Sequence, residues 1–257
     1  MAYKRNHGEY VQPFQRLQVQ LANLINNTTA GERLPSEPEL AKQLGVSRAT
    51  LREAMRTFEG QGLIRRRQGV GTFVVGHPQI IETGLEVLES IESLAKKINL
   101  PVTMGALNIA QVAANAQQAE ALQVAEGTPL VQVSRVIRAQ ERPVAYLIDV
   151  LPEDVLTPAE LREGFTGSVL DFLLRRGNPP LTQSLTEIRA VPAPSDVAHA
   201  LEVQRGDVLL MFVARLFAAN SQVVDFSLSY FLPGYFKFHI VRSVVAEHAV
   251  VSNNSSG

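Results

Sequence analysis

The chain has 257 residues, a net charge of −1 and no cysteine. Without cysteine there are neither disulfides nor thiolate metal sites, which excludes the small disulfide-stabilised secreted class. The N-terminal segment has no apolar signal core, and no run of the sequence has the length and hydropathy of a membrane span. We therefore expect a cytoplasmic protein with no membrane partner, built as one large or two modest domains.

The net charge averages two regions of opposite sign. Residues 1–77 contain 11 lysines and arginines and 6 aspartates and glutamates, a net charge of +5. The remaining residues contain 13 and 19, a net charge of −6. A basic front and an acidic rear are typical of a nucleic-acid-binding head on a body that is kept off the DNA.

The first predicted helix begins at Pro13, after a polar segment of residues 1–12 that is expected to be loose. Its apolar residues form one stripe at helical spacing, which should pack against the next two helices. The stripe consists of Phe14, Leu17, Leu21, Leu24 and Ile25.

Residues 34–75 predict two short helices, a tight turn between them and a basic two-stranded hairpin. Ser36 and Glu39 have the S-x-x-E spacing of a capping box, so the first helix begins there. Gly45 permits the turn, and Ser47 caps the second helix. The apolar residues at positions i, i+4 and i+7 of that second helix face inward. They are Leu51, Met55 and Phe58.

The second of these helices leaves Arg48, Thr50 and Arg52 at or near its exposed side. Guanidinium groups on the first turns of a capped helix suit the major groove, where they can pair with guanine O6 and N7. Arg66, in the basic hairpin, suits the phosphates or the flanking minor groove. The alternative is an ordinary helical hairpin with solvated charges. The caps, the turn, the apolar spacing and the basic wing agree on a winged helix-turn-helix.

This stretch, LPSE-x-ELA-x-x-LGVSR-x-TLREAM and then GLI-x-x-x-x-GVGTFV, resembles the DNA-binding domain of the GntR family of bacterial transcription regulators. The resemblance covers nearly every position of residues 31–75. Pro38 stands where the family commonly has a DNA-contacting arginine, so the operator preference does not carry over. The predicted DNA-binding set is Ser36, Arg48, Thr50, Arg52, Arg66, Gln68 and Gly69. All of these except Ser36 and Arg66 are implied by the resemblance.

Behind this head, which we assign to residues 1–75, residues 76–84 are the predicted linker. Leu85, Leu88, Ile91, Leu94 and Ala95 then have helical spacing and should pack on the second domain or on a partner subunit. From Val102 onward, β-rich runs joined by hairpin-length returns predict an α+β domain with mostly antiparallel pairing. The expected strands are residues 106–112, 130–137, 144–151, 185–191, 208–217 and 223–231, and the expected helices are residues 115–124, 168–175 and 195–203.

A helix–strand–hairpin unit occurs twice in this second domain. Residues 119–130, AEALQVAEGTPL, align with residues 198–209, AHALEVQRGDVL. The repeat predicts a single sheet with an approximate internal two-fold axis.

The second domain resembles the UTRA effector-binding domain, which follows this kind of head in the HutC branch of the GntR family. Motifs that carry the resemblance include VSR at residues 133–135, RPVA at 142–145 and D-x-x-x-x-YF at 225–231. It spans about residues 85–245, which leaves residues 246–257 as a polar tail. The resemblance implies a chorismate-lyase-like antiparallel sheet with helices. It also implies a small acidic or phosphorylated metabolite bound between helices and sheet.

Four residues are the predicted effector-binding set: Arg135, Ser168, Asp225 and Tyr230. Arg135 lies in the middle of an apolar strand and either binds an anion or pairs internally with Asp225 or Asp149. Ser168 either offers a helix N-terminus to an anion or only caps that helix. Sugar-phosphate-binding members of the branch usually carry Arg-x-Arg on the first strand, which this chain lacks. A smaller monoanion or a more apolar acid is therefore expected.

Together these patterns predict a homodimeric bacterial transcription regulator, most simply a repressor, whose affinity for double-stranded operator DNA is set by a small acidic metabolite. The alternatives are a DNA-binding dimer without an effector and a chorismate-lyase-like enzyme fused to a DNA-binding head. The five histidines are scattered without ligand spacing, and no nucleophile–base or phosphate-loop pattern occurs. We therefore expect no catalytic residue, metal or cofactor.

Overall fold

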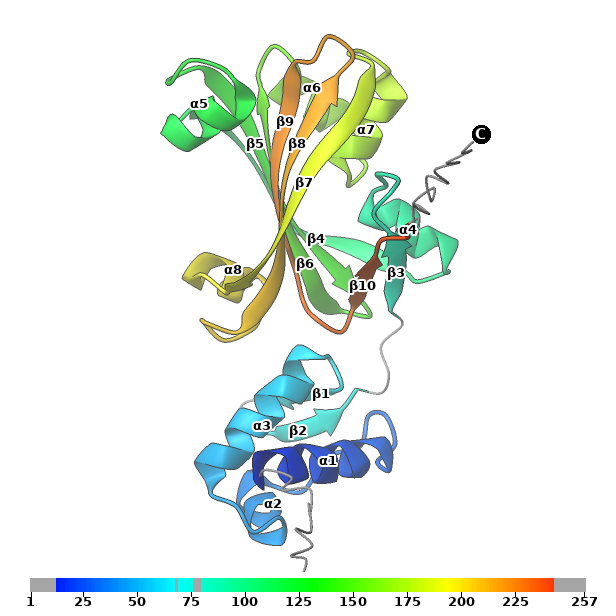
Figure 1. The fold of residues 1–257 in the computed structure, drawn as a ribbon, viewed down its shortest axis with the longest axis vertical. Coiled ribbons are helices and arrows are strands. Elements are labelled where there is room, and N and C mark those ends of the chain that lie inside the picture. Colours follow the sequence, from blue (N-terminus) through cyan, green and yellow to red (C-terminus); the bar gives the residue numbers. More distant parts are fainter. Residues whose placement is uncertain (1–12, 68, 76–79, 243–257) are drawn as a thin grey trace, which may run out of the picture.

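The computed structural model describes residues 13–67, 69–75 and 80–242, and it contains two domains, which Figure 1 shows one above the other. The expected loose start, residues 1–12, and the polar tail, residues 246–257, lie outside the described residues. The head comprises α1 (Pro13–Asn26), α2 (Glu37–Gln43), α3 (Arg48–Gly60), β1 (Ile64–Arg67) and β2 (Gly71–Val74).

The head is the winged helix-turn-helix that the sequence predicted. The apolar stripes of the three helices meet in one core, in which Leu17, Leu40 and Leu51 are fully buried. Ser47 Oγ accepts a hydrogen bond of 3.1 Å from the Thr50 amide, which caps α3. Strands β1 and β2 pair antiparallel to form the wing. Because the caps and the core set the register of α3, its polar face is fixed outward.

The rear domain is built on one six-stranded sheet with the strand order β4-β5-β6-β9-β8-β7 and only antiparallel pairs. Its strands are β4 (Val102–Ala113), β5 (Pro129–Ala139), β6 (Arg142–Pro152), β7 (Leu181–Pro192), β8 (Val208–Ala218) and β9 (Val223–Phe231). Its helices are α4 (Ile91–Lys97), α5 (Ala116–Leu122), α6 (Pro158–Gly164), α7 (Val169–Arg176) and α8 (Ser195–Ala200). Figure 1 shows α5 and α8 on one side of the sheet and α4 and α7 on the other.

The internal repeat is visible in the hydrogen bonds of the fold. The Ala114 amide donates to the Thr128 carbonyl, and the Ala193 amide donates to the Asp207 carbonyl, which are the aligned positions of the two copies. The symmetric strand order agrees, because β4, β5 and β6 mirror β7, β8 and β9 about the centre of the sheet. The predicted two-fold sheet is therefore confirmed.

The segment before α4 differs from the sequence prediction. Residues 81–84 form β3 (Ile81–Gly84), which pairs in parallel with β10 (Phe236–His239). The expected helix over residues 85–95 begins only at Ile91, because Ser90 caps α4 by accepting from the Ser93 amide at 3.0 Å. Leu88, predicted to be part of the apolar stripe, is exposed. Residues 76–79 of the expected linker lie outside the described residues, and its last four residues are strand.

The two domains contact each other at the C-terminal end of α3. Arg142 donates a hydrogen bond of 3.0 Å from its guanidinium to the Glu59 carbonyl, and its guanidinium lies 5.5 Å from the centre of the Tyr235 ring. Gly234 passes so close to the head that a Cβ there would lie 2.3 Å from the Gln61 carbonyl oxygen. The loop between β9 and β10 is therefore pressed against the residues that follow α3.

Two glycines of the rear domain offer a matched test of this contact. Gly234 and Gly206 have φ values of +92° and +88°, so alanine is strained at both positions, but only Gly234 faces the head. We expect Gly234→Ala to loosen the contact, because the added methyl group displaces residue 61. Hydrogen–deuterium exchange of a peptide covering residues 59–63 should then be faster than in Gly206→Ala. Equal exchange in the two variants would contradict the contact.

Candidate nucleic-acid interface and ligand cavity

The N-terminal turns of α3 present polar side chains to solvent. Arg48, Thr50 and Arg52 are all exposed, while Leu51 between them is buried. The Thr50 hydroxyl lies 2.8 Å from Ser47 Oγ, so it belongs to the cap as well as to the exposed surface. An exposed, capped helix start with two arginines has the shape and charge that a major groove accepts.

Two of the predicted contact residues are engaged within the head. Ser36 donates from its amide and its hydroxyl to the Glu39 carboxylate, at 2.9 and 2.6 Å, so its role is to start α2. Arg66, whose side chain is only 19% exposed, donates from Nε to Glu59 at 2.7 Å and lies 4.0 Å from Glu37. Arg66 is therefore held beside α3 by carboxylates, and a phosphate contact would have to compete with that pairing.

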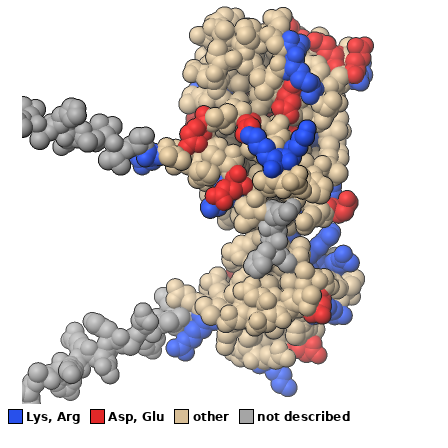
Figure 2. Space-filling model, turned by 90° about the vertical axis from the view of Figure 1, so that its right-hand side faces the viewer, with Lys and Arg blue, Asp and Glu red and all other residues tan. Residues whose placement is uncertain are grey.

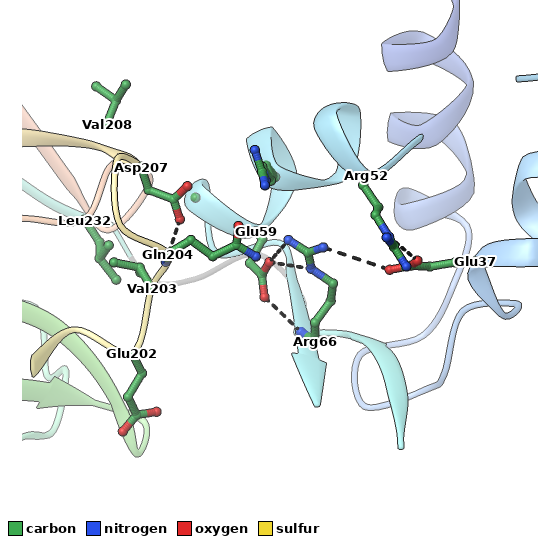
Figure 3. A pocket seen from close by; sticks show the side chains of 12 residues that line it. Glu37, Arg52, Glu59, Arg66, Glu202, Val203, Gln204, Asp207, Val208 and Leu232 are labelled. Carbon is green, nitrogen blue, oxygen red and sulfur yellow. Dashed lines mark hydrogen bonds and ion pairs between the residues drawn. The ribbon is translucent and has the colours of Figure 1, made fainter. Parts of the chain in front are cut away.

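Arg52 is also engaged within the head, by Glu37. Its Nε donates to Glu37 at 2.6 Å while its side chain stays 51% exposed. Figure 3 shows Glu37 between the side chains of Arg52 and Arg66, with Glu59 on the other side of Arg66. A carboxylate that orients an arginine leaves its remaining N–H groups free in a fixed plane. Glu37 thus fixes the direction in which the Arg52 guanidinium points away from α3.

This cluster forms one wall of a cleft of about 520 Å³ between the head and the rear domain. Figure 3 shows Glu202, Gln204 and Asp207 of the rear domain on the opposite side from Arg52. Arg65 of the wing also lies 3.8 Å from Glu202. In this arrangement, carboxylates of the rear domain face the basic side of the head.

The tip of the wing is a tight turn. The Val70 amide donates to the Arg67 carbonyl at 3.0 Å, and Gly69 has a φ of +74° with nothing within 4 Å of a built Cβ. Gly69 is therefore open to an approaching backbone. Arg67 lies over the ring of Phe73 at 5.3 Å and is exposed. Gln68, another predicted contact, lies outside the described residues.

On the face of the molecule that Figure 2 shows, acidic and basic side chains are interspersed rather than gathered in a basic patch. Within residues 13–67, 69–75 and 80–242, no helix is long and apolar enough to cross a membrane. The same residues contain no group of three or more side chains suited to a metal ion.

The rear domain contains a cavity of about 610 Å³ on the side of the sheet that α4 and α7 cover. Its floor is formed by inward-facing residues of β5 to β9, such as Leu147 and Phe212. Its cover is the segment from β3 to α4, and its rim includes Ser168 at the start of α7. A concave site with apolar walls and a few convergent polar groups is the usual form of a small-molecule site.

Arg135, the predicted anion-binding residue, is already paired. It is only 4% exposed and donates from its guanidinium to the Asp149 carboxylate on the neighbouring strand β6. Its Nε lies 3.9 Å from Glu92 of α4. Of the two internal partners that the sequence allowed, the structure selects Asp149. A buried guanidinium needs such a carboxylate, because an unpaired charge in the interior is costly.

Ser168 caps α7, as the plainer of its two sequence interpretations expected. Its hydroxyl accepts from the Asp171 amide at 3.1 Å, and the Asp171 carboxylate accepts from Ser90 at 2.7 Å. Ser168 is buried and lies on the cavity wall. The starts of α4 and α7 are therefore tied together at the rim of the cavity.

Asp225 and Glu92 are the unsatisfied acidic groups of the cavity. Burial and the nearby Asp149 hold the pKa of Asp225 well above its usual value, against the attraction of Arg135. Burial also raises the pKa of Glu92, and Arg135 partly offsets that shift. Among the described residues, neither oxygen of Glu92 nor Oδ1 of Asp225 has a hydrogen-bond partner.

The structure does not bring Tyr230 to this site. Asp225 and Phe231 line the cavity from β9, whereas Tyr230 has the opposite parity on that strand and points to the other face. Burial raises the pKa of Tyr230, and Asp196 of α8 contributes, which places its hydroxyl on the side of α8. Arg135, Ser168 and Asp225 of the predicted set do converge. Sequence reasoning missed Glu92, because it considered only the apolar stripe of this segment and gave its glutamates no role.

A capped α3 that presents arginines, joined to a sheet domain with a polar cavity, defines a DNA-binding protein of the regulator class with a ligand-binding domain. The comparisons with known proteins identify it further. The family model described as "Bacterial regulatory proteins, gntR family" matches residues 14–74, and that of the "UTRA domain" matches residues 99–237. The chain belongs to the GntR family of bacterial regulators and carries a UTRA domain.

Several relatives match most of this chain. The HTH-type transcriptional repressor NagR of Bacillus subtilis is 26% identical over 217 residues, which cover 84% of this chain and 87% of that protein. The histidine utilization repressor of Klebsiella aerogenes is 31% identical over 193 residues, 74% of this chain and 77% of that protein. The crystal structure of PhnF from Mycobacterium smegmatis has a TM-score of 0.60 at 23% identity, covering 89% of this chain and all of that one, and shows the same fold.

The buried carboxyl of Asp225 predicts a pH-dependent stability. The pKa of Asp225 is higher in the folded than in the unfolded protein. Its contribution to the free energy of unfolding is therefore greatest below the unfolded pKa of about 4, and it is lost as the pH rises through the folded pKa. Asp225→Asn should remove this loss, so its free energy of unfolding should fall less between pH 4.5 and 8 than that of the wild type. The difference can approach about 1.4 kcal/mol per pH unit.

Urea titrations across that pH range measure the effect. The control is Asp154→Asn, which changes an exposed carboxyl after β6 and should keep the wild-type slope. A wild-type slope in Asp225→Asn would show that the carboxyl is not held in its protonated form.

Proposed function

We propose that the protein is a transcriptional repressor that reads operator DNA with α3 and the wing, and that a small molecule in the rear cavity releases it. The observation that carries the proposal is that Arg48 and Arg52 are exposed at the start of α3, while the apolar residues of the same helix are buried in the core of the head. Two relatives that match most of this chain are named as repressors, which supports repression rather than activation. The family supports a regulator rather than an enzyme.

In the proposed complex, α3 lies in the major groove and the wing follows the backbone. Arg48 and Arg52 address base edges, and Gly69 brings the wing backbone close to a phosphate or the flanking minor groove. Two copies of the chain, related by a two-fold axis, would read inverted half-sites, as symmetric operators require. The homodimer and the cytoplasmic setting are parts of this proposal.

A continuous set of contacts connects the cavity with the head. The segment covering the cavity begins in β3, whose Ile81 amide donates to the Tyr235 carbonyl at 2.9 Å. Tyr235 and Gly234 lie against residues 61 and 62, directly after α3. A ligand that moves the cover therefore acts on β3, on the loop before β10 and on the base of α3. We infer that this route carries the effector signal to the head.

Linkage sets the requirement for such control. The effector must bind the DNA-incompetent arrangement more tightly, and DNA must then weaken effector binding by the same factor. The head arrangement described above, with rear-domain carboxylates facing Arg52 across the cleft, is a reasonable DNA-incompetent state because those carboxylates repel phosphate.

Replacing Arg52 tests the groove assignment. We expect Arg52→Ala to weaken binding to the preferred duplex by about 1–3 kcal/mol and to relax the preference at one base position, because one bidentate base contact is removed. The duplex is selected from a randomised pool by the wild-type chain, and binding is measured by fluorescence anisotropy at a fixed salt concentration.

The matched control is Arg189→Ala, which removes an exposed arginine of strand β7 in the rear domain that pairs with Glu187. This variant should bind like the wild type. If Arg52→Ala keeps both the affinity and the base preference of the wild type, α3 does not read the major groove through this residue.

A further inference from the structure

The rear cavity is strongly acidic for a site that was expected to take an acid. Among its described lining residues Arg135 is the single basic side chain, and five are acidic. The acidic residues are Glu86, Glu89, Glu92, Asp149 and Asp225. An anionic ligand would add charge of the sign that the cavity already has in excess.

Three of these five carboxylates accept hydrogen bonds within the protein. Asp149 holds Arg135, Glu86 accepts from the Val241 amide, and Glu89 pairs with Lys97. The guanidinium of Arg135 donates to Asp149, and its Nε, which has no hydrogen-bond partner among the described residues, lies 3.9 Å from Glu92. The cation that the sequence offered to an acidic ligand is therefore already neutralised.

The other two carboxylates point to a missing donor. Asp225 is 6% exposed, lines the cavity, and has no hydrogen-bond partner for Oδ1 within the described part of the chain. Glu92 lines the same cavity, and both of its oxygens are buried without hydrogen-bond partners there, although Oε1 lies 3.9 Å from Arg135 Nε. Buried polar atoms in folded proteins are nearly always hydrogen-bonded, so groups left over at a cavity wall are the expected contacts of a ligand.

We propose that the ligand of this cavity carries a cationic N–H donor, such as an ammonium, amidinium or imidazolium group, that lies between Glu92 and Asp225. The inference rests on the proposed function only in taking this cavity as the effector site. The sequence pattern implied an acidic metabolite, whereas the group that we propose to lie between Glu92 and Asp225 carries the opposite charge.

The remaining walls define what the cation is attached to. Phe212, Phe231 and Phe238 line the cavity, and their rings can contact the face of a flat cation or an apolar body. Hydroxyls of Ser227 and Ser229 on β9 offer further hydrogen bonds. A compact amine-bearing or amidine-bearing molecule with an aromatic or hydroxylated body fits these surroundings.

Proton release should accompany the binding of such a ligand. The charged groups that face Asp225 and Glu92 from the packed elements are Arg135 on β5, Asp149 on β6 and Asp171 on α7. Burial favours the protonated forms of both carboxyls in the free protein. A cation placed between them favours ionisation, so protons leave as the ligand enters.

The experiment compares three probes of one size and shape on the full-length wild-type protein: benzamidine, benzamide and benzoate. Isothermal titration at neutral pH should give a dissociation constant for benzamidine at least about tenfold lower than for benzamide, because its N–H groups bind carboxylate with charge assistance. Benzoate should not bind measurably. Repeating the benzamidine titration in phosphate and in Tris should give different apparent enthalpies, which reports the released protons.

Two variants locate the binding. Asp225→Asn and Glu92→Gln should each reduce the preference for benzamidine over benzamide to within about threefold, because each removes a charge-assisted bond. Glu92 is half-buried, so this variant serves if Asp225→Asn fails to fold. The control Asp154→Asn should retain the wild-type preference. A preference for benzoate, binding of none of the probes, or an unchanged preference in both folded variants overturns the proposal.

A DNA-release assay separates this inference from the proposed function. If benzamidine binds with the stated preference but no ligand of this class alters DNA affinity, the cation site stands and the effector coupling fails. If an acidic compound releases DNA while benzamidine does not bind, the coupling stands and the cation site fails.

Discussion

The parallel pairing of β3 with β10 is the constraint on which the arrangement of the molecule depends. It joins residues 81–84, which arrive directly from the head, to residues 236–239, which follow the last strand of the sheet. By doing so it fixes the cover of the cavity and presses the loop at Gly234 against the head. Without this short ribbon, the six-stranded sheet would still close its own core, but the cover of the cavity would lose its attachment, and the head would rely on contacts such as that of Arg142 with the Glu59 carbonyl.

The electrostatics of the cavity follow from a single buried pair. Arg135 and Asp149 neutralise each other on adjacent strands, and losing either partner would leave a buried charge at a cost of about 3–5 kcal/mol. This pair is therefore structural first, and a ligand meets its outer edge. The chemical character of the site then depends on Asp225 Oδ1 and the two oxygens of Glu92, which accept no hydrogen bond within the described residues, although Glu92 lies 3.9 Å from the Arg135 guanidinium.

The parts of the structure that local signals control were predicted well. The caps at Ser36 and Ser47, the apolar spacing of α3 and the repeat at residues 119–130 and 198–209 each depend on neighbours within a few residues or on the chain's own duplication. The parallel β3–β10 pair was not predicted, because its strands are four residues long and lie about 150 residues apart, where no periodicity can signal them.

The candidate cavity shows the same division. Arg135, Ser168 and Asp225 were found from residue type and position, but the partner of Arg135 stayed open because strand register decides between Asp149 and Asp225. Tyr230 was expected in the cavity, but successive residues of a strand face opposite sides of the sheet, and it is the next residue, Phe231, that faces the cavity. Glu92 was missed because its contact with Arg135 joins α4 to β5, and the apolar spacing of residues 85–95 does not signal contacts between elements.

If the head binds DNA as proposed, the pairing of Arg52 and Arg66 with carboxylates of the head has a consequence for specificity. An exposed ion pair such as Arg52 with Glu37 contributes only about 0–1 kcal/mol, so it does little for stability. It does, however, give any phosphate a competitor for the same guanidinium, and that competition lowers non-specific affinity on every sequence alike. A base edge that accepts the N–H groups left over by Glu37 avoids the competition. In the proposed complex, holding Arg52 by one edge would therefore widen the difference between operator and other DNA without adding a contact to the operator.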